Sequence, residues 1–554
     1  MRPIYGIDLG TTYSKCAIVG PTDGQLRVFD LDKAVDDTRR IPILRSAVAV
    51  TVDTGRKVAF VGMQSLVKIE EWDEGDPPLR RFEESKIWIG QDLTKGGDAP
   101  PWPFEPHDWE YRPEDIGAIV LRKVQREVEA DRGPAMSRVV VTHPQYFTDT
   151  QRYATRQAVE IAGLELVDTL TEPDAAAIAF GVDASPGKYM IFDLGGGTLD
   201  VTVAKIGGPH LEVLASDGLK RAGRDFDSLI FERMVRDYQV LYDGFDTAYL
   251  DDTTRQFWMR DAERVKRQLN DPEQKLAKIK FQCRNKAFPD GQERKLVVRR
   301  EEFLTDAQPI IEDCVRCANS ALENARLKWS ELSGIICVGG STRLLPLREA
   351  LQRESGVELR TDVEPDTAIV RGAALYAHRI ATRPAAIISV PTDAAAANAV
   401  RPSSAAAMAK DVRLIGVLAR GLGVKALDAK QHRDVVVNLV KKGRQLPLPS
   451  GERKTFRTAE ANKPTLEVIL YEGEDSDPDL CEVLGKVELT GFPPGPAGQP
   501  VDVLIEIDGN GTKHLVVSAF GQRSEAMIQF DPARVVHADD IARRRDFIAS
   551  LVVL

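Results

Sequence analysis

Two similar glycine-rich segments constrain the fold of this chain most strongly. The first glycine turn lies in YGIDLGTTYSK and contains Asp8, Gly10, Thr11 and Thr12. The second glycine turn lies in MIFDLGGGTLD and contains Asp193, Gly195, Gly196, Gly197, Thr198 and Asp200. In both segments an apolar, strand-like stretch ends in an acid, which is followed by glycine and threonine. The chain therefore carries one local pattern twice.

This pattern suits phosphate binding. Glycine adopts positive φ angles and lets a ligand approach the backbone closely. Successive N–H groups form a concave anion site, and a carboxylate at the strand end can hold the water shell of a magnesium ion. One such turn is more often an ordinary hairpin. Two in one α/β region predict a duplicated domain that holds a nucleoside triphosphate between its halves, since the motifs GxxxxGK[ST] and GxGxxG are both absent.

Residues 1–382 alternate strand-like and helix-like segments, which is typical of α/β architecture. We expect strands at YGIDLG, SRVVVTHP, YMIFDLG and GIICVGG. Apolar residues at three- and four-residue spacing predict helices over 113–130, 148–164 and 254–270.

A third glycine turn lies in CVGGSTRLLPLREAL, after another apolar strand. Gly339, Gly340 and Ser341 leave room for a nucleoside, and the Arg343 guanidinium can stack on a purine. Alone, this segment is equally well an ordinary strand-to-helix turn. Beside the other two turns, it completes a site for phosphates, sugar and base.

The composition of the chain changes after residue 382. Residues 383–410 contain eleven alanines and three prolines and are typical of a linker. Residues 416–533 predict an all-β domain. Its expected strands are DVVVNLV, KTFRTA, LEVILYEG, EVLGKVEL, VDVLIEI, KHLVVSAF and EAMIQF. A short helix is expected in ADDIARRRDFIASLVVL.

Length, charge and cysteine content exclude several classes of protein. A chain of 554 residues is too long to fold around a single hydrophobic core, so we expect several domains. Its net charge of −10 gives no indication of a surface that binds nucleic acid or membranes. No apolar run approaches the roughly 18 residues of a membrane span. Met1-Arg2-Pro3 leads directly into a strand, and six cysteines make no disulfide framework, so we expect a cytoplasmic protein. The pair Cys314 and Cys317 is expected to pack within a helix rather than hold a metal.

These segments together resemble the 70-kDa heat-shock (DnaK-type) chaperone family, which is built on the ATPase fold of actin and sugar kinases. The similar segments, in family order, are IDLGTTYS, THPQYFTDTQRYAT, IAGLELVDTLTEPDAAAIAFG, FDLGGGTLDVTV, AERVKRQL, VGGSTR and EPDTAIVRGAA. Actin and sugar kinases share the glycine turns but lack the AERVKRQL helix. The resemblance covers nearly the whole chain and implies an α/β, actin-like duplicated ATPase domain with two lobes, followed by an all-β sandwich that binds peptides. The implied boundaries are 1–382 (ATPase), 383–415 (insert and linker), 416–533 (sandwich) and 534–554 (a helix left from the family's lid).

The resemblance also implies roles for single residues in the hydrolysis of ATP to ADP and phosphate with Mg²⁺. Lys86, in SKIWIG, would face the γ-phosphate, although without the family it reads as a surface lysine. Glu172, in TEPDAAA, would be the catalytic glutamate. Asp8, Asp193 and Asp200 would surround the magnesium ion and the attacking water, with Asp8 and Asp193 touching the metal through water. The phosphates would be bound by Gly10, Thr11, Thr12, Gly195, Gly196, Gly197 and Thr198.

The nucleoside would be held by a helix face and by the third glycine turn. Glu263, Lys266, Arg267 and Asn270 fall at i, i+3, i+4 and i+7, on one face, and resemble the family's adenosine clamp. Gly339, Gly340, Ser341 and Arg343 would complete the platform, with Asp366 of EPDTAIVRGAA near the site.

In the β domain the resemblance implies a slot for an extended apolar peptide. Its predicted lining residues are Val424, Phe456, Leu466 and Val468, with Leu427 and Ala459 arching over it. For each of these residues a place in the ordinary sandwich core is an equally good interpretation.

The chain departs from the family pattern in three places. Arg413 puts a charge into the apolar linker, residues 412–415, and the alanine-rich insert lengthens the tether, so coupling between ATP and peptide is expected to weaken. After residue 533 only one helical segment follows, so we expect a bound peptide to exchange fast. Ile87 replaces an arginine after Lys86, and Arg224 stands where an acid is expected.

Two classes of function follow. The first is an ATP-dependent chaperone that binds extended segments of unfolded proteins and works with J-domain and nucleotide-exchange partners. The second is a nucleotide-switched scaffold whose β domain docks one dedicated protein. A small-molecule kinase on the same fold would leave the β domain without a purpose.

Overall fold

The computed structural model describes residues 2–554 except 22, 34–39, 54, 72–75, 77–78, 92–110, 132, 182–185, 208–209, 242–244, 246, 248–249, 251, 284–292, 362, 383–412, 416–417, 419, 429–432, 508–512 and 529–535. The alanine-rich insert lies outside the described residues. None of the helices that the structure describes combines the length and the apolarity needed to cross a membrane.

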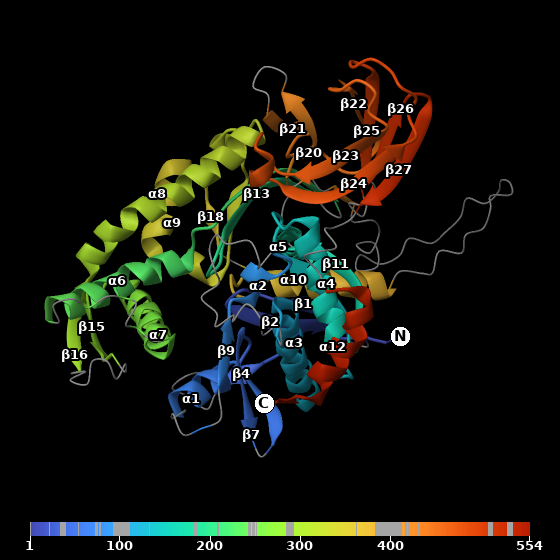
Figure 1. The fold of residues 1–554 in the computed structure, drawn as a ribbon. Coiled ribbons are helices and arrows are strands. Elements are labelled where there is room, and N and C mark those ends of the chain that lie inside the picture. Colours follow the sequence, from blue (N-terminus) through green and yellow to red (C-terminus); the bar gives the residue numbers. More distant parts are fainter. Residues whose placement is uncertain are drawn as a thin grey trace, which may run out of the picture.

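The first large sheet has β1 (Tyr5–Asp8) at its centre (Figure 1). On one side β1 pairs in parallel with β10 (Arg138–His143), which pairs in parallel with β11 (Glu165–Thr171). On the other side it pairs antiparallel with β2 (Tyr13–Val19), which is followed by β3 (Leu26–Val28). The acid of the first glycine turn therefore ends the central strand.

The second large sheet repeats this order and these strand directions. Its central strand, β12 (Gly187–Leu194), is parallel to β17 (Gly334–Val338), and β17 is parallel to β18 (Leu359–Arg360). On the other side lie β13 (Leu199–Gly207) and β14 (His210–Leu219), both antiparallel to their neighbours. The acid of the second glycine turn thus lies near the end of the matching central strand.

Two helices lie between the large sheets and pack tightly on each other. α5 (Glu172–Gly181) and α10 (Ala368–Thr382) share an apolar core with residues of both sheets. A Cβ on Gly372 of α10 would lie 1.7 Å from the Ala175 carbonyl oxygen, so only glycine permits this contact. The close packing fixes the first residue of α5, Glu172, relative to both central strands.

The outer helices confirm the helical periodicity of the sequence. The three predicted segments form α3 (Pro113–Ala130), α4 (Asp149–Ile161) and α7 (Asp252–Leu269). α4 begins at a capping box, in which the Thr148 side chain accepts from the Gln151 N–H and the Gln151 side chain accepts from the Thr148 N–H. Cys314 and Cys317 are buried in α8 (Arg300–Asn324), as the packing interpretation predicts.

The other elements before residue 382 complete the α/β region. They are β4 (Asp32–Lys33), β5 (Arg40–Ile41), β6 (Leu44–Arg45), β7 (Ala47–Asp53), β8 (Arg56–Val61), α1 (Met63–Glu71), β9 (Arg80–Glu83), α2 (Ser85–Trp88), α6 (Gly223–Leu241), β15 (Leu276–Phe281), β16 (Arg294–Arg299) and α9 (Leu345–Ser355).

After the insert, the chain forms two four-stranded antiparallel sheets that share one apolar core. One sheet has the order β21 (Arg433–Val440), β20 (Leu422–Asp428), β23 (Thr465–Glu472), β24 (Glu482–Thr490). The other has the order β22 (Leu448–Arg457), β25 (Pro500–Ile507), β26 (Lys513–Ala519), β27 (Gln522–Ile528). All seven predicted strands are present, and β20 was not predicted.

The chain after the insert contacts the α/β region at the second large sheet and at the helix α4. β19 (Arg413–Ile415) adds a sixth strand to the second sheet, parallel to β14. On the other side Lys513 of β26, only 2% exposed, forms an ion pair with Asp149 of α4. Residues 413–415, which the sequence predicts as linker, are therefore part of a sheet.

The C-terminal segment packs on the α/β region. The family resemblance had instead implied a helix left from the lid of the β domain. α12 (Ala538–Ser550) contacts α3 and α4 (Figure 1), and Ile548 and Leu551 are buried in the core of the first sheet. β28 (Val552–Val553), which was not predicted, pairs in parallel with β8. The Arg544 guanidinium forms an ion pair with buried Asp115. The segment thus completes the first α/β unit.

Candidate functional site

A cavity of about 900 Å³ opens between the two large sheets. Every residue that the sequence assigns to nucleotide, metal or catalysis lines it. The three glycine turns, the α7 face, Lys86 and Glu172 thus meet around one space, although they are far apart in the sequence.

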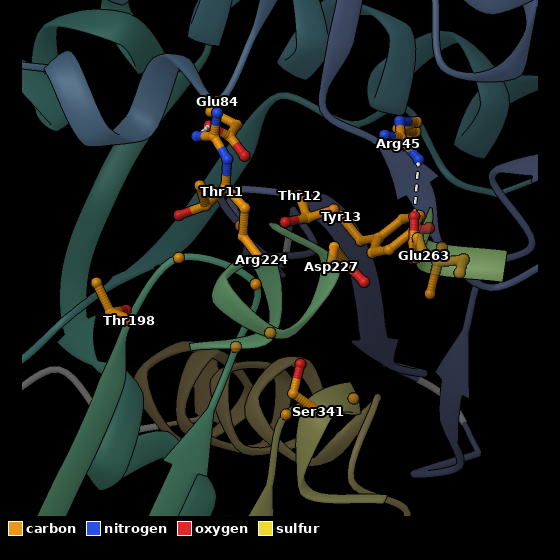
Figure 2. A pocket seen from close by; sticks show the side chains of 18 of the residues that line it. Thr11, Thr12, Tyr13, Arg45, Glu84, Thr198, Arg224, Asp227, Glu263 and Ser341 are labelled. Carbon is orange, nitrogen blue, oxygen red and sulfur yellow. Dashed lines mark hydrogen bonds and ion pairs between the residues drawn. The ribbon is translucent and has the colours of Figure 1, made fainter. Parts of the chain in front are cut away.

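The first and second glycine turns face each other directly (Figure 2). A Cβ added to Gly196 would lie 2.2 Å from the Thr12 Oγ1, and one added to Gly197 would lie 3.5 Å from the Thr11 Cγ2. A side chain at position 196 would thus collide with Thr12, whereas the distance at position 197 is an ordinary van der Waals contact. Both turns expose N–H groups and hydroxyls to the same space, which is the arrangement that an anionic ligand requires.

The third glycine turn interlocks with the second. Gly339 has a φ of 82°, and a Cβ there would lie 2.6 Å from the Asp193 Oδ1. The Gly223 N–H donates to the Gly195 carbonyl oxygen at 3.1 Å, and a Cβ on Gly223 would lie 2.2 Å from the Ser341 Oγ. The glycines at 223 and 339 therefore let three chain segments converge at one end of the cavity.

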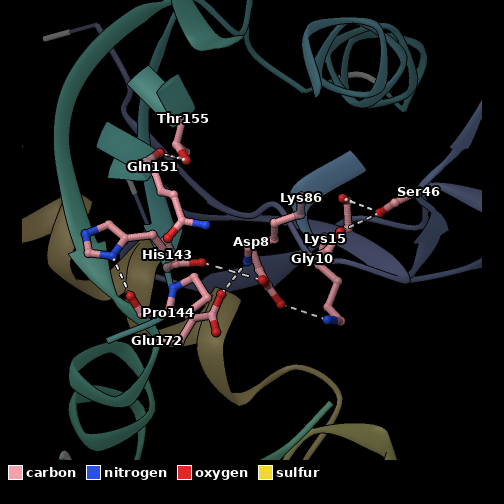
Figure 3. Close-up of polar contacts among 12 residues, drawn as sticks. Asp8, Gly10, Lys15, Ser46, Lys86, His143, Pro144, Gln151, Thr155 and Glu172 are labelled. Carbon is pink, nitrogen blue, oxygen red and sulfur yellow. Dashed lines mark hydrogen bonds and ion pairs between the residues drawn. The ribbon is translucent and has the colours of Figure 1, made fainter. Parts of the chain in front are cut away.

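Two lysine–carboxylate pairs lie at the centre of the cavity (Figure 3). The Lys86 Nζ is 2.5 Å from the Glu172 Oε1, and the Lys15 Nζ is 2.7 Å from the Asp8 Oδ2. Lys86 is only 7% exposed, so it is a buried residue of the site. Burial, opposed in part by Lys86, raises the pKa of Glu172.

The second turn contributes two buried acids, and among the described residues no lysine forms an ion pair with either of them. Asp193 and Asp200 pair across β12 and β13. Burial, together with Glu172 and Asp8, raises the pKa of Asp193 to about 8. Burial, together with Glu172 and Asp193, raises the pKa of Asp200 well above its ordinary value. The cavity therefore holds carboxyl groups that a cation would ionise.

Two ion pairs cross the cavity between the large sheets. Arg45, of the first half, lies 3.5 Å from Glu263 of α7, and Arg224 forms an ion pair with Glu84. Figure 2 shows Arg224 reaching past Thr11 to Glu84. Ile87, which belongs to the third departure from the family, packs against the second turn, because its Cδ1 would lie 3.4 Å from a Cβ on Gly197.

The α7 face and Asp366 form the opposite end of the cavity. Lys266 is 2.8 Å from Asp227, and the Arg267 Nη2 is 2.5 Å from the Glu263 Oε1. The Asn270 side-chain amide donates to the Arg343 carbonyl oxygen at 2.9 Å. Arg343 in turn lies 2.8 Å from Asp366, so the helix and the third glycine turn form one polar platform.

The six predicted peptide-binding residues lie on or near the four-stranded sheets. Val424 and Val468 are 1% and 6% exposed and belong to the shared core. Phe456 and Leu466 are partly buried and pack against that core, whereas Leu427 is 51% exposed and Ala459 is exposed. For Val424 and Val468, the geometry fits the core interpretation as well as a slot.

Sequence reasoning missed Lys15 and Tyr146. Lys15 follows Thr12 by three residues, and its alternation with Tyr13 on β2 could have indicated that it faces the cavity. Tyr146 follows β10, shares a hydrogen bond with Thr198, and has a pKa raised chiefly by burial. Tyr146 lies in the family-like segment THPQYFTDTQRYAT, but no role was predicted for it, because its partner Thr198 lies on the other half of the α/β region.

The sequence of this chain is similar to those of known proteins. A sequence model described as Hsp70 protein matches residues 102–548. The protein named Chaperone protein DnaK from Cenarchaeum symbiosum (strain A) is 30% identical over 557 residues, covering 99% of this chain and 75% of that protein. Its namesake from Nitrosopumilus maritimus (strain SCM1) is 28% identical, covering 98% of this chain and 77% of that protein. The chain belongs to the Hsp70 family.

Proposed function

We propose that this protein is an ATP-dependent chaperone that hydrolyses ATP in the cavity and binds extended apolar segments of unfolded proteins in its β domain. One observation carries the nucleotide part. The two facing glycine turns surround a lysine–glutamate pair and three further acids within one cavity of about 900 Å³. The matching order of the two large sheets supports the duplicated, two-lobed, actin-like arrangement.

The proposed reaction is in-line attack of water on the γ-phosphate. Such a transfer passes through a loose transition state, so catalysis consists of positioning and charge neutralisation. Lys86 would donate to the γ-phosphate, and Glu172, which forms an ion pair with Lys86, would orient the water. The N–H groups of both glycine turns would bind the phosphate oxygens. No side chain needs to become a covalent nucleophile.

The donor set of the cavity fits magnesium that enters with the nucleotide. Among the described residues no three His, Cys, Asp or Glu side chains form a direct metal cluster. Magnesium usually keeps several waters and binds one or two carboxylates together with substrate phosphates. Asp8 and Asp193 would hold it through water. When bound, the ion neutralises the charge that develops on the phosphates.

We expect binding of Mg·ADP at pH 7 to release about one proton, because a carboxyl with a pKa near 8 holds its proton there and must ionise beside the cation. The folded-state pKa of Asp193 is raised, so the release should be largest below pH 8 and should approach zero at pH 9. Calorimetric titration in buffers of different ionisation enthalpy measures the number of protons.

The Asp193→Asn variant is the matched control for this titration, since it keeps the size of the side chain but carries no titrating carboxyl. It should release about one proton fewer than the wild type. Equal proton release in the two proteins at pH 7 would rule out the assigned ionisation of Asp193.

The β domain is proposed to bind peptides by backbone hydrogen bonds and one or two buried side chains, in a slot lined by the six predicted residues. Phe456 is the most informative of them, because it is a large, partly buried side chain at the edge of the core. β19 joins the β domain to the second sheet, which gives nucleotide and peptide a direct structural connection.

The test is ATP turnover with and without a panel of unfolded peptides. Many peptides should stimulate the wild type, and Phe456→Ala should abolish the stimulation while basal turnover persists. Met527→Ala is the matched control, because Met527 is 64% exposed on β27 and no role is assigned to it. If no peptide changes turnover, a scaffold that docks one dedicated partner replaces the chaperone.

A further inference from the structure

Lys15 is a buried cation of the cavity that the proposed reaction leaves without a role. It lies on β2, directly after the first glycine turn, and its side chain is 13% exposed. Its Nζ is 2.7 Å from the Asp8 Oδ2, and both residues line the cavity. Burying an ammonium group costs free energy unless a partner compensates it, so its position calls for an explanation.

The strand geometry fixes the direction of Lys15. Side chains alternate along a strand, so Tyr13 and Lys15 share one face, and both line the cavity. Ser14, between them, points to the opposite side, where it is buried and lies 2.9 Å from the Ser46 Oγ. Figure 3 shows the Lys15 side chain extending to Asp8. The ammonium group is thus part of the cavity wall.

The carboxylates around Lys15 keep its ammonium group charged. Burial alone lowers the pKa of Lys15, but Asp8, Asp366 and Asp193 overcome this effect and raise it, so the group stays charged. Asp366 belongs to the platform with Arg343, whereas Lys86 is bound to Glu172. Lys15 therefore interacts with the acids of both glycine turns and with Asp366 of the nucleoside platform, on the wall of the cavity that would receive the phosphates.

Charge balance favours an exchange of partners at Lys15. Of the four buried acids in this part of the cavity, Asp8 pairs with Lys15 and Glu172 pairs with Lys86, whereas Asp193 and Asp200 have raised pKa values. An arriving magnesium ion would take over the neutralisation of Asp8 and free the ammonium group for the phosphates. Lysine binds phosphate as a point charge with three rotatable donors, which permits such an exchange without movement of the backbone.

We propose that Lys15 is a second phosphate-binding lysine, which pairs with Asp8 when no nucleotide is bound and donates to the β-phosphate of the bound nucleotide. This inference rests on the proposed function and adds a residue to it. Its consequence is a site in which magnesium and Lys15 act together on the nucleotide, so that ADP affinity depends more on magnesium than it does without Lys15.

The test measures the affinities of adenosine, AMP and ADP, with magnesium and with chelator, for the full chain and its Lys15→Met variant. A charge-assisted hydrogen bond contributes about 1.5–3 kcal/mol, so ADP should bind about 10- to 100-fold more weakly to Lys15→Met. The loss should be smaller in chelator, where Lys15 stays paired with Asp8. Adenosine and AMP should bind both proteins alike, because they carry no β-phosphate.

Lys15→Arg and Lys15→Gln separate a phosphate contact from a structural role. Lys15→Arg keeps the charge and should keep most of the ADP affinity. Lys15→Gln can still donate to Asp8 but should lose ADP affinity as Lys15→Met does, and it serves as the second variant if Lys15→Met does not fold. Equal ADP binding by the wild type and Lys15→Gln, or an equal loss for adenosine and ADP, overturns the role of Lys15 alone. A wild type that binds none of the three ligands overturns the proposed function as well.

Discussion

Replacing Lys86 by alanine is expected to slow ATP hydrolysis by about 10²- to 10³-fold and to change ATP affinity only a few-fold. The Lys86 Nζ lies 2.5 Å from the Glu172 Oε1 in a cavity where both side chains are 7% exposed. A buried ammonium that meets the γ-phosphate stabilises charge mainly in the transition state, so its removal lowers the rate of the chemical step more than binding. Single-turnover phosphate release and equilibrium ATP binding measure the two effects separately.

Lys86→Arg is the conservative comparison for this prediction. It keeps a positive charge near Glu172 but changes its geometry, so it should recover part of the lost rate. Loss of ATP binding in Lys86→Ala, at an unchanged unfolding temperature of the nucleotide-free protein, would show that Lys86 holds the ground state instead. An unchanged rate would remove it from the site.

Replacing Ile548 by alanine is expected to destabilise the α/β region by about 2–5 kcal/mol, the usual cost of a buried Ile-to-Ala change. Ile548 is fully buried in the core of the first sheet, and the segment after it extends that half of the molecule through β28. The Val61 N–H of β8 donates to the Leu554 carbonyl oxygen at 3.1 Å. Denaturant unfolding measures the loss, and hydrogen exchange at β8 should increase with it.

Arg545→Ala on the same helix is the matched control. Arg545 is exposed, and exposed substitutions usually change stability by less than about 0.5 kcal/mol. If Ile548→Ala and Arg545→Ala unfold alike and only peptide retention differs, the helix acts as a lid on the β domain, as the family resemblance implied.

Periodicity predicts most of the elements of this fold. The helix predicted over 113–130 forms with these bounds, and all seven strands expected after residue 416 are present. β20 escaped prediction because GLGVKALD mixes glycines with charged residues and shows no clean alternation. Its burial comes from the partner strands β21 and β23, which a local pattern does not contain.

The family and most residues around the cavity could be predicted, because each glycine turn is a short contiguous segment with a recognisable pattern. Asp8 and Asp193 each end a strand and precede a tight turn, so local sequence identifies them. The pairs Lys15–Asp8 and Arg224–Glu84 were not predicted, since each depends on distances between separate elements. The position of residues 536–554 could not be predicted either, because the apolar residues of this segment suit a lid helix as well as the core of the first sheet.

The central claim is that the cavity between the two large sheets is an ATPase site. The most direct test measures whether the wild-type chain hydrolyses ATP that is present in a smaller amount than the protein. Mixed with magnesium and a small amount of radiolabelled ATP, the protein should convert all of it to ADP and phosphate, and a chelator should stop the reaction. Intact ATP after prolonged incubation with correctly folded protein would contradict the assignment of the two glycine turns to ATP hydrolysis.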